Sequence, residues 1–252
     1  MNKKTFIALT AMILILCFAA NEVGAAPVIP NIDISVGGEG TQPGVTSMSL
    51  VLLITILSIA PAILILMTSF TRIVIVLGFV RTSLGTQQMP PNQVLIGLAL
   101  FMTLFVMSPT LGQVNDVAVQ PYLKGEITQT QALEKATVPM KQFMASHTRE
   151  KDLLLFMKYT KTEKPASVED IPITVLVPAF AISELKTAFQ MGFMIFIPFL
   201  IIDMVVASTL MSMGMMMLPP VMISLPFKIL LFILVDGWHL VVKSLLSSFN
   251  LG

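Results

Sequence analysis

The chain has 252 residues, of which 55% are hydrophobic and only 12% are charged. Its mean hydropathy of +0.88 is extreme for a soluble protein and typical of membrane proteins. The formal net charge of +1 offers no basic face to phosphates, so the composition excludes nucleic-acid binding.

The first 25 residues have the pattern of a signal peptide. Lys3 and Lys4 precede an apolar stretch, and the small residues at 23–25 form a cleavage site. Cleavage removes Cys17, the only cysteine, and with it any disulfide, thiolate chemistry or cysteine metal site. The alternative is an uncleaved first anchor helix.

A flexible leader is expected at residues 26–47, which are rich in Gly, Pro and Thr. Residues 48–114 then predict a first helical hairpin, with two long apolar runs separated by a turn at 85–92. The first run is longer than the roughly 20 residues that span a bilayer. We therefore expect it to tilt or to kink at Pro61.

Residues 115–170 break the apolar pattern, with acidic and basic side chains in equal number. They predict a small polar helical domain, one helix of which follows the capping sequence TQTQ at 128–131. If the amino terminus is exported, Arg72 and Arg81 face the cytoplasm. The polar domain then lies in the periplasm of a Gram-negative cell.

A second helical hairpin is predicted for residues 171–252, with spans at roughly 188–217 and 225–246. Proline recurs through this apolar sequence, at Pro172, Pro178, Pro198, Pro219, Pro220 and Pro226. Proline removes a backbone donor, and broken backbone at membrane depth is tolerated only where protein or water satisfies it. The predicted fold class is all-α, built from membrane-associated hairpins with proline-broken helices.

The turn of the second hairpin is unusually rich in methionine. Five methionines fall within seven residues, namely Met211, Met213, Met215, Met216 and Met217. Methionine gives a deformable apolar surface that can close around many shapes. The composition indicates a seal around something that moves.

Ionisable side chains are embedded in the apolar sequence of the second half. Asp203 is flanked by apolar residues on both sides, and the others are Glu184, Lys186, Lys228, Asp236 and Lys243. Such groups are costly in a membrane unless they are paired or hydrated, so they are functional candidates. Ion pairs within or between subunits that set the register of helices are favoured over a proton relay.

Two histidines and two phenylalanines need separate interpretations. His239 is expected to be a hydrogen-bonded interface residue and His147 a solvated surface residue, and together they make no metal site. Phe189 and Phe193 fit ordinary helix packing, although a ring of subunits could turn them toward a lumen.

Motifs of hydrolytic enzymes are missing from the sequence, which has no phosphate-binding loop, zinc helix or nucleophile elbow. An intramembrane protease would have only Asp203 and Asp236 as a catalytic pair, without a second glycine-rich signature around them. The sequence therefore predicts a protein that is not an enzyme and carries no cofactor.

Several motifs resemble one family closely. They are PAFAISELKTAFQMGF at 178–193, PFLIID at 198–203, MGMMMLPP at 213–220, SLPFK at 224–228 and LVDGW at 234–238. Together they resemble the FliP family of flagellar biosynthesis proteins, with a likeness that covers roughly residues 45–250. The resemblance implies a non-enzymatic, pore-forming subunit of the flagellar type III export gate in the bacterial inner membrane.

By the same resemblance, five copies form a ring that joins the membrane partners FliQ and FliR in a conical, all-helical assembly within the flagellar basal body. Apolar helices would then contact neighbouring subunits or membrane lipid, and unfolded export substrates would pass through the pore. Met215, Met216 and Met217 match the methionine gasket of the family. The family's embedded charges, which bridge adjacent subunits, correspond in this sequence to Arg149, Glu184, Asp203 and Lys228.

Two other functions stay open at this point. One is the homologous subunit of a virulence injectisome, although the long leader favours the flagellar system. The other is a secondary transporter or ion channel that uses Asp203 as a coupling site. Transporters of that kind show broken spans in two related halves, whereas the prolines within the apolar segments of this chain concentrate in the second half.

Overall fold

The computed structural model describes residues 47–86, 89–160, 165, 167–215 and 218–249. The predicted signal peptide, nearly all of the leader, and Met216 and Met217 lie outside the described residues. The chain divides into two units, Met1–Ser58 and Ile59–Gly252. Helix α2 (Ser47–Leu66) starts in the first unit and ends in the second.

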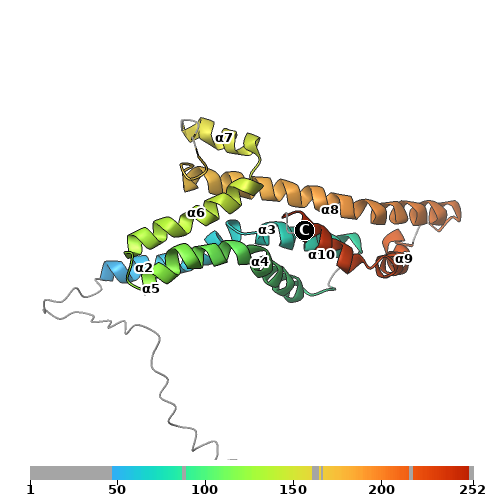
Figure 1. Cartoon of the computed structure of the whole chain (residues 1–252). Helices are drawn as coiled ribbons and strands as arrows, with labels where there is room; N and C mark the ends of the chain where they lie inside the picture. The colour runs from blue at the N-terminus through green and yellow to red at the C-terminus, as the bar shows by residue number, and fades with distance from the viewer. Residues whose placement is uncertain (1–46, 87–88, 161–164, 166, 216–217, 250–252) are drawn as a thin grey trace, which may run out of the picture. The chain divides into compact units, whose positions relative to one another are not determined.

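The described part of the chain consists of helices joined by short turns and contains no strand, which confirms the all-α prediction. Figure 1 shows the helices of the second unit, with α8 as the longest. After α2 they are α3 (Phe70–Ser83), α4 (Asn92–Val114), η1 (Asn115–Val119), α5 (Gln120–Leu123), α6 (Gln129–His147), α7 (Glu150–Thr160), α8 (Ile173–Ser212), α9 (Pro220–Leu234) and α10 (Gly237–Ser247).

Helix α3 lies at the centre of the second unit and packs against both α4 and α8. Its buried side chains recur at three- and four-residue intervals, which places them on one face of the helix. Ile73, Val76, Leu77 and Val80 are all fully buried. Gly192 of α8 lets Phe79 of α3 come so close that an added Cβ would overlap the ring.

Helices α4 and α8 are long and apolar enough to cross a membrane, and α9 with α10 could form a third, bent span. The first of these spans runs on from α4 through the π-helical turn η1 and α5 to Leu123. Helices α6 and α7 carry most of the polar sequence; α6 lies against α4 and α8, and α7 lies against α8. The predicted capping box before α6 is present, since Thr128 and Gln131 cap each other's backbone N–H groups.

The prolines that predicted helix breaks lie partly at helix starts and partly inside helices. Pro172 and Pro219 are the N-caps of α8 and α9. Pro61 lies inside α2, and Pro178 and Pro198 lie inside the continuous helix α8. The chain leaves helical geometry instead at 67–69, where the hydroxyl of Thr71 donates to the carbonyl of Ile65 at 3.3 Å. Proline is tolerated inside an apolar helix when neighbouring groups satisfy the freed carbonyl.

A second break separates α9 from α10, whose axes differ in direction by 63°. Asp236 at this bend has a φ of 52° and a ψ of 55°, the left-handed conformation that Asp and Asn adopt more readily than other side chains. Gly237 follows, and the ring of Phe232 occupies the space that a Cβ would need there. The bend thus depends on a residue that tolerates positive φ and on a glycine beside it.

Candidate functional site

A buried ion pair joins α3 to α8. Nε of Arg72 donates to Oε2 of Glu184 at 2.8 Å, and Nη2 bonds to the other carboxylate oxygen. Arg72 is only 2% exposed and Glu184 is not exposed at all. Such a two-point pair between a guanidinium and a carboxylate is the strongest geometry that these groups form.

The carboxyl-terminal segment completes the surroundings of Arg72. Nη1 donates to the carbonyl and to the hydroxyl of Ser248, at 2.8 and 2.9 Å. The guanidinium carbon lies 3.9 Å from the centre of the Phe249 ring, within the range of a cation–π contact. The buried charge of Arg72 on α3 is therefore satisfied by α8 and by the residues that follow α10.

A polar network lies beside this pair and includes Ser183, the residue of α8 that precedes Glu184. The hydroxyl of Ser183 donates to Oδ2 of Asp152 at 2.6 Å, and Nη2 of Arg149 approaches the same oxygen at 2.5 Å. Burial alone would raise the pKa of Asp152, but these two hydrogen bonds and the charge of Arg149 outweigh it and lower the pKa. Nε and Nη1 of Arg149 are buried and have no hydrogen-bond partner among the described residues.

A second embedded ion pair joins α8, α9 and the end of α3. Nζ of Lys228 donates to Oδ2 of Asp203 at 2.6 Å and to the carbonyl of Ser83 at 3.2 Å. The hydroxyl of Ser224 donates to the other carboxylate oxygen at 2.5 Å. Lys228 is 2% exposed, so its charge depends on these partners.

All four residues predicted to form ion pairs thus have a partner of opposite charge within the chain. The prediction that Arg149, Glu184, Asp203 and Lys228 bridge adjacent subunits stays a prediction. Sequence reasoning assigned Arg72 only to the membrane topology and missed its bond to Glu184. The signal that could have suggested the pair is that Arg72 and Glu184 both lie in long apolar stretches, where a charge needs a partner.

The methionine-rich turn follows the end of α8 at Ser212. Met211, Met213 and Met215 are 60%, 67% and 44% exposed, so they do not pack within this chain. Gly214 adopts a positive φ of 74°, which turns the chain away from the helix axis. The gasket assignment rests mainly on Met216 and Met217, which are not described, and stays a prediction.

The structure also bears on the predictions for Phe189 and Phe193 and for His147. Phe189 and Phe193 are 55% and 59% exposed, and Phe189 packs edge-on against Phe79 with ring centres 5.4 Å apart. The solvated surface position predicted for His147 is wrong. Its ring lies 4.7 Å from that of Phe143 and 5.3 Å from that of Phe249, and Nδ1 is 2.9 Å from the carbonyl of Phe143.

Much of the apolar surface of α8 is not covered by other parts of the chain. Only 6% of its most apolar window is buried, against 39% for the span that begins with α4. The buried charges are neutralised inside the chain, and the long apolar helices are left exposed. These two features define a helical membrane protein whose apolar surface must be covered by lipid or by other proteins. Among the described residues, no cluster of three or more His, Cys, Asp or Glu is suited to a metal ion.

Comparison with known proteins identifies the family. The model of the FliP family matches residues 53–245. The chain is 70% identical to the flagellar biosynthetic protein FliP of Bacillus subtilis over 81% of its own length and 92% of that protein. It is 54% identical to FliP of Caulobacter vibrioides over 84% of its own length and 81% of that protein. It is 50% identical to FliP of Aquifex aeolicus over 88% of its own length and 92% of that protein. The chain belongs to the FliP family.

Proposed function

We propose that this chain is a pore-forming subunit of the flagellar type III protein export gate, and that it passes unfolded flagellar proteins across the inner membrane. The observation that carries the proposal is the family match across almost all of the helical part of the chain. The names of the relatives refer to the flagellum, which favours this system over a virulence injectisome. The role is one of assembly and conduction rather than catalysis.

The distribution of apolar surface supports an assembled state. Along α8, Phe193, Met194 and Ile201 are all more than half exposed in the isolated chain. A single copy encloses no channel, so a pore requires several copies arranged around an axis. We propose a homo-oligomer, most simply the ring of five copies implied by the family, joined by FliQ and FliR and by basal-body components.

The internal ion pairs support the same interpretation. A charge exposed on an apolar helix would oppose both membrane insertion and subunit packing. Pairing Glu184 with Arg72 and Asp203 with Lys228 removes this obstacle before assembly. Each subunit can then present apolar helix faces to its neighbours.

The proposal is tested first by complementation. A flagellated bacterium that lacks its own FliP should regain secretion of hook and filament proteins when it expresses this chain. The detergent-extracted complex should have a mass that corresponds to several copies plus partner subunits. A chain that restores secretion while remaining a monomer in the complex would contradict the ring.

The gasket is tested by replacing Met215, Met216 and Met217 together by alanine. The ring should assemble normally but leak small solutes, because the seal loses deformable bulk. The matched control is the double variant Met211→Ala/Met213→Ala, which removes similar exposed side chains just before the gasket. A triple variant that stays impermeable and exports normally would rule out the gasket.

A further inference from the structure

The two helices that meet at the bend near Asp236 bury opposite kinds of side chain. In α9 the only polar side chains, Ser224 and Lys228, are buried, and every exposed side chain is apolar. In α10 the buried residues are apolar or glycine, and every polar side chain is exposed. An apolar outer surface suits hydrocarbon, whereas a polar one suits water. The surroundings that the chain is built for therefore change at the bend.

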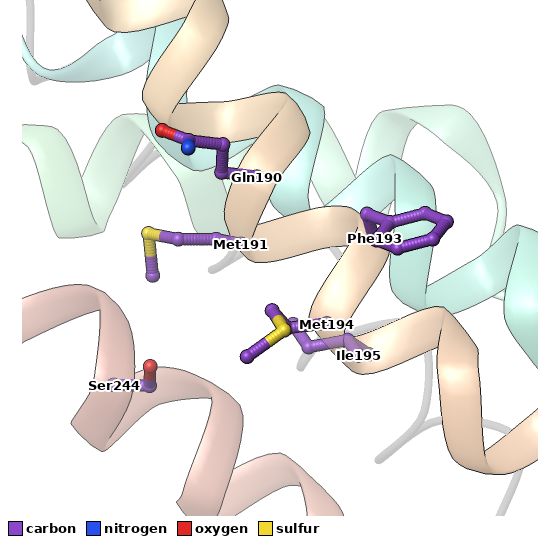
Figure 2. Close-up of a pocket in the computed structure, with 6 residues that line it drawn as sticks. All are labelled: Gln190, Met191, Phe193, Met194, Ile195 and Ser244. Carbon is purple, nitrogen blue, oxygen red and sulfur yellow. The ribbon is translucent and has the colours of Figure 1, made fainter.

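The polar side chains of α10 lie on its outer face. Val241 and Leu245 lie on the opposite face, in the core cluster that also contains the buried residues of α3. The flank of α10 toward α8 is uncovered too, because a groove of about 670 Å³ separates the helices there. Figure 2 shows Ser244 of α10 across this groove from Met191 and Met194 of α8. The outer row consists of Asp236 at the bend and, at four-residue intervals on α10, His239, Lys243 and Ser247.

The bend carries the residue pattern of a membrane–water interface. Ile233, Leu234 and Val235 are 68%, 74% and 48% exposed at the end of α9. Trp238 follows and is 39% exposed, with one side of its ring edge-on to Phe232 at a centre-to-centre distance of 5.3 Å. Tryptophan is enriched at membrane surfaces because its large apolar ring carries one polar N–H group.

The charges of the outer row argue against two other surroundings for α10. Neither Asp236 nor Lys243 forms an ion pair within the described part of the chain, and unpaired charges are costly in hydrocarbon. An apolar face of a second subunit would leave these charges equally unmatched, and it gives no reason for the polarity to reverse at a bend. Lipid headgroups do, since water hydrates the carboxylate and phosphate oxygens accept from the lysine.

We propose that this bend lies at the surface of a phospholipid membrane, with α9 in the hydrocarbon, Trp238 at the level of the headgroups and the outer row of α10 in contact with phosphates and water. Helix α10 then runs along the membrane surface instead of completing a third span, as amphipathic helices do. The change in direction of 63° turns it out of the path of α9. The ring proposed above uses the surface of α8, so this placement of α9 and α10 can fail without it.

The depth of the bend is tested by fluorescence, because Trp238 is the only tryptophan of the chain. The full chain is reconstituted into vesicles of phosphatidylcholine and phosphatidylglycerol, with part of the phosphatidylcholine brominated either close to the headgroup or close to the methyl end of the acyl chain. The first label should quench the fluorescence more strongly. Stronger quenching by the second label would place the bend deep in the hydrocarbon. Quenching by neither would mean that protein covers the bend or that it lies away from the membrane, and either result would overturn the proposal.

The reversal of polarity is tested with single cysteines in a Cys17→Ser background, labelled in the same vesicles by a membrane-impermeant maleimide present on both sides. Ser247→Cys on the outer row of α10 should react. Its matched partner is Leu230→Cys on α9, which is 55% exposed in the chain itself and should lose most of its labelling until the vesicles are dissolved in denaturant. Labelling of both positions would show that lipid does not cover α9. Protection of both would show that α10 also lies in hydrocarbon or under protein, and each of these outcomes would refute the placement.

Discussion

Replacement of Gly192 by alanine should loosen the contact between α3 and α8. A Cβ at this position would lie 2.4 Å from two ring atoms of Phe79 and 2.9 Å from the Cβ of that residue. Real Cβ atoms essentially never lie within 3 Å of a non-bonded heavy atom, so something must move. Because one of the overlapping atoms is the Cβ of Phe79, rotation of its ring alone cannot relieve the overlap, and the two helices must shift apart.

The size of the effect follows from two opposing terms. Overpacking a well-packed contact destabilises a protein by about 1–3 kcal/mol, and an overlap with a helix-anchored atom belongs in the upper part of that range. Alanine stabilises a helix by up to about 1 kcal/mol relative to glycine. The net loss is therefore about 1–2 kcal/mol. For a chain of this size it corresponds to a fall in Tm of about 2–8 °C.

The assay is thermal unfolding of the chain in detergent, followed by the fraction that still elutes as folded protein after heating. Gly97→Ala in α4 is the matched control, since no atom lies within 4 Å of its added Cβ. It should leave Tm unchanged or raise it. The decisive comparison is Gly192→Ala in a Phe79→Ala background, where the overlap is gone. If the fall in Tm is as large there as in the wild-type chain, the steric reasoning is refuted.

Two further predictions concern the buried polar groups. Glu184→Gln leaves Arg72 buried without its negative partner, which should destabilise the chain by about 3–5 kcal/mol and reduce the yield of folded protein in detergent; a normal yield would contradict the pairing. The pKa of Asp152 is lowered in the folded chain, so its contribution to stability is complete above the unfolded value of about 3.9 and is lost as the pH falls through the lower folded value. The difference in Tm between wild type and Asp152→Asn should accordingly shrink below about pH 4, and a constant difference down to pH 3 would show that ionisation of Asp152 is not the cause.

Local sequence was sufficient for several elements of the fold. The capping box at Thr128 and Gln131 predicts the start of α6 because it involves only residues within one helical turn. The turn between α3 and α4 follows from Gly85, which has a φ of 76°, and from the prolines after it. Long apolar runs likewise predict the spans, since bilayer thickness alone sets their length.

Long-range pairing could not be predicted in the same way. Arg72 and Glu184 are 112 residues apart, and nothing near either residue specifies the other. The position of the first helix break also depends on tertiary packing, since Pro61 carries the stronger local signal and yet lies inside α2. At the second break, Asp236 adopts the left-handed conformation without a side-chain capping bond, and the ring of Phe232 packs against Gly237, so the bend depends on a tertiary contact as well as on local sequence.

Exposure separates the charges that can reach a neighbouring subunit from those that cannot. The side chain of Asp203 is 23% exposed, whereas those of Lys228, Glu184 and Arg72 are 3%, 0% and 3% exposed. Of these two ion pairs, therefore, only Asp203 has an edge free for a second chain. Removing both charges of a buried pair is far less destabilising than removing one. We therefore expect Asp203→Asn/Lys228→Met to leave the Tm of the isolated chain nearly unchanged but to reduce recovery of the oligomer. Arg72→Met/Glu184→Gln should change oligomer recovery only in proportion to Tm. Normal oligomer recovery for the Asp203 variant would mean that this pair acts within the subunit alone.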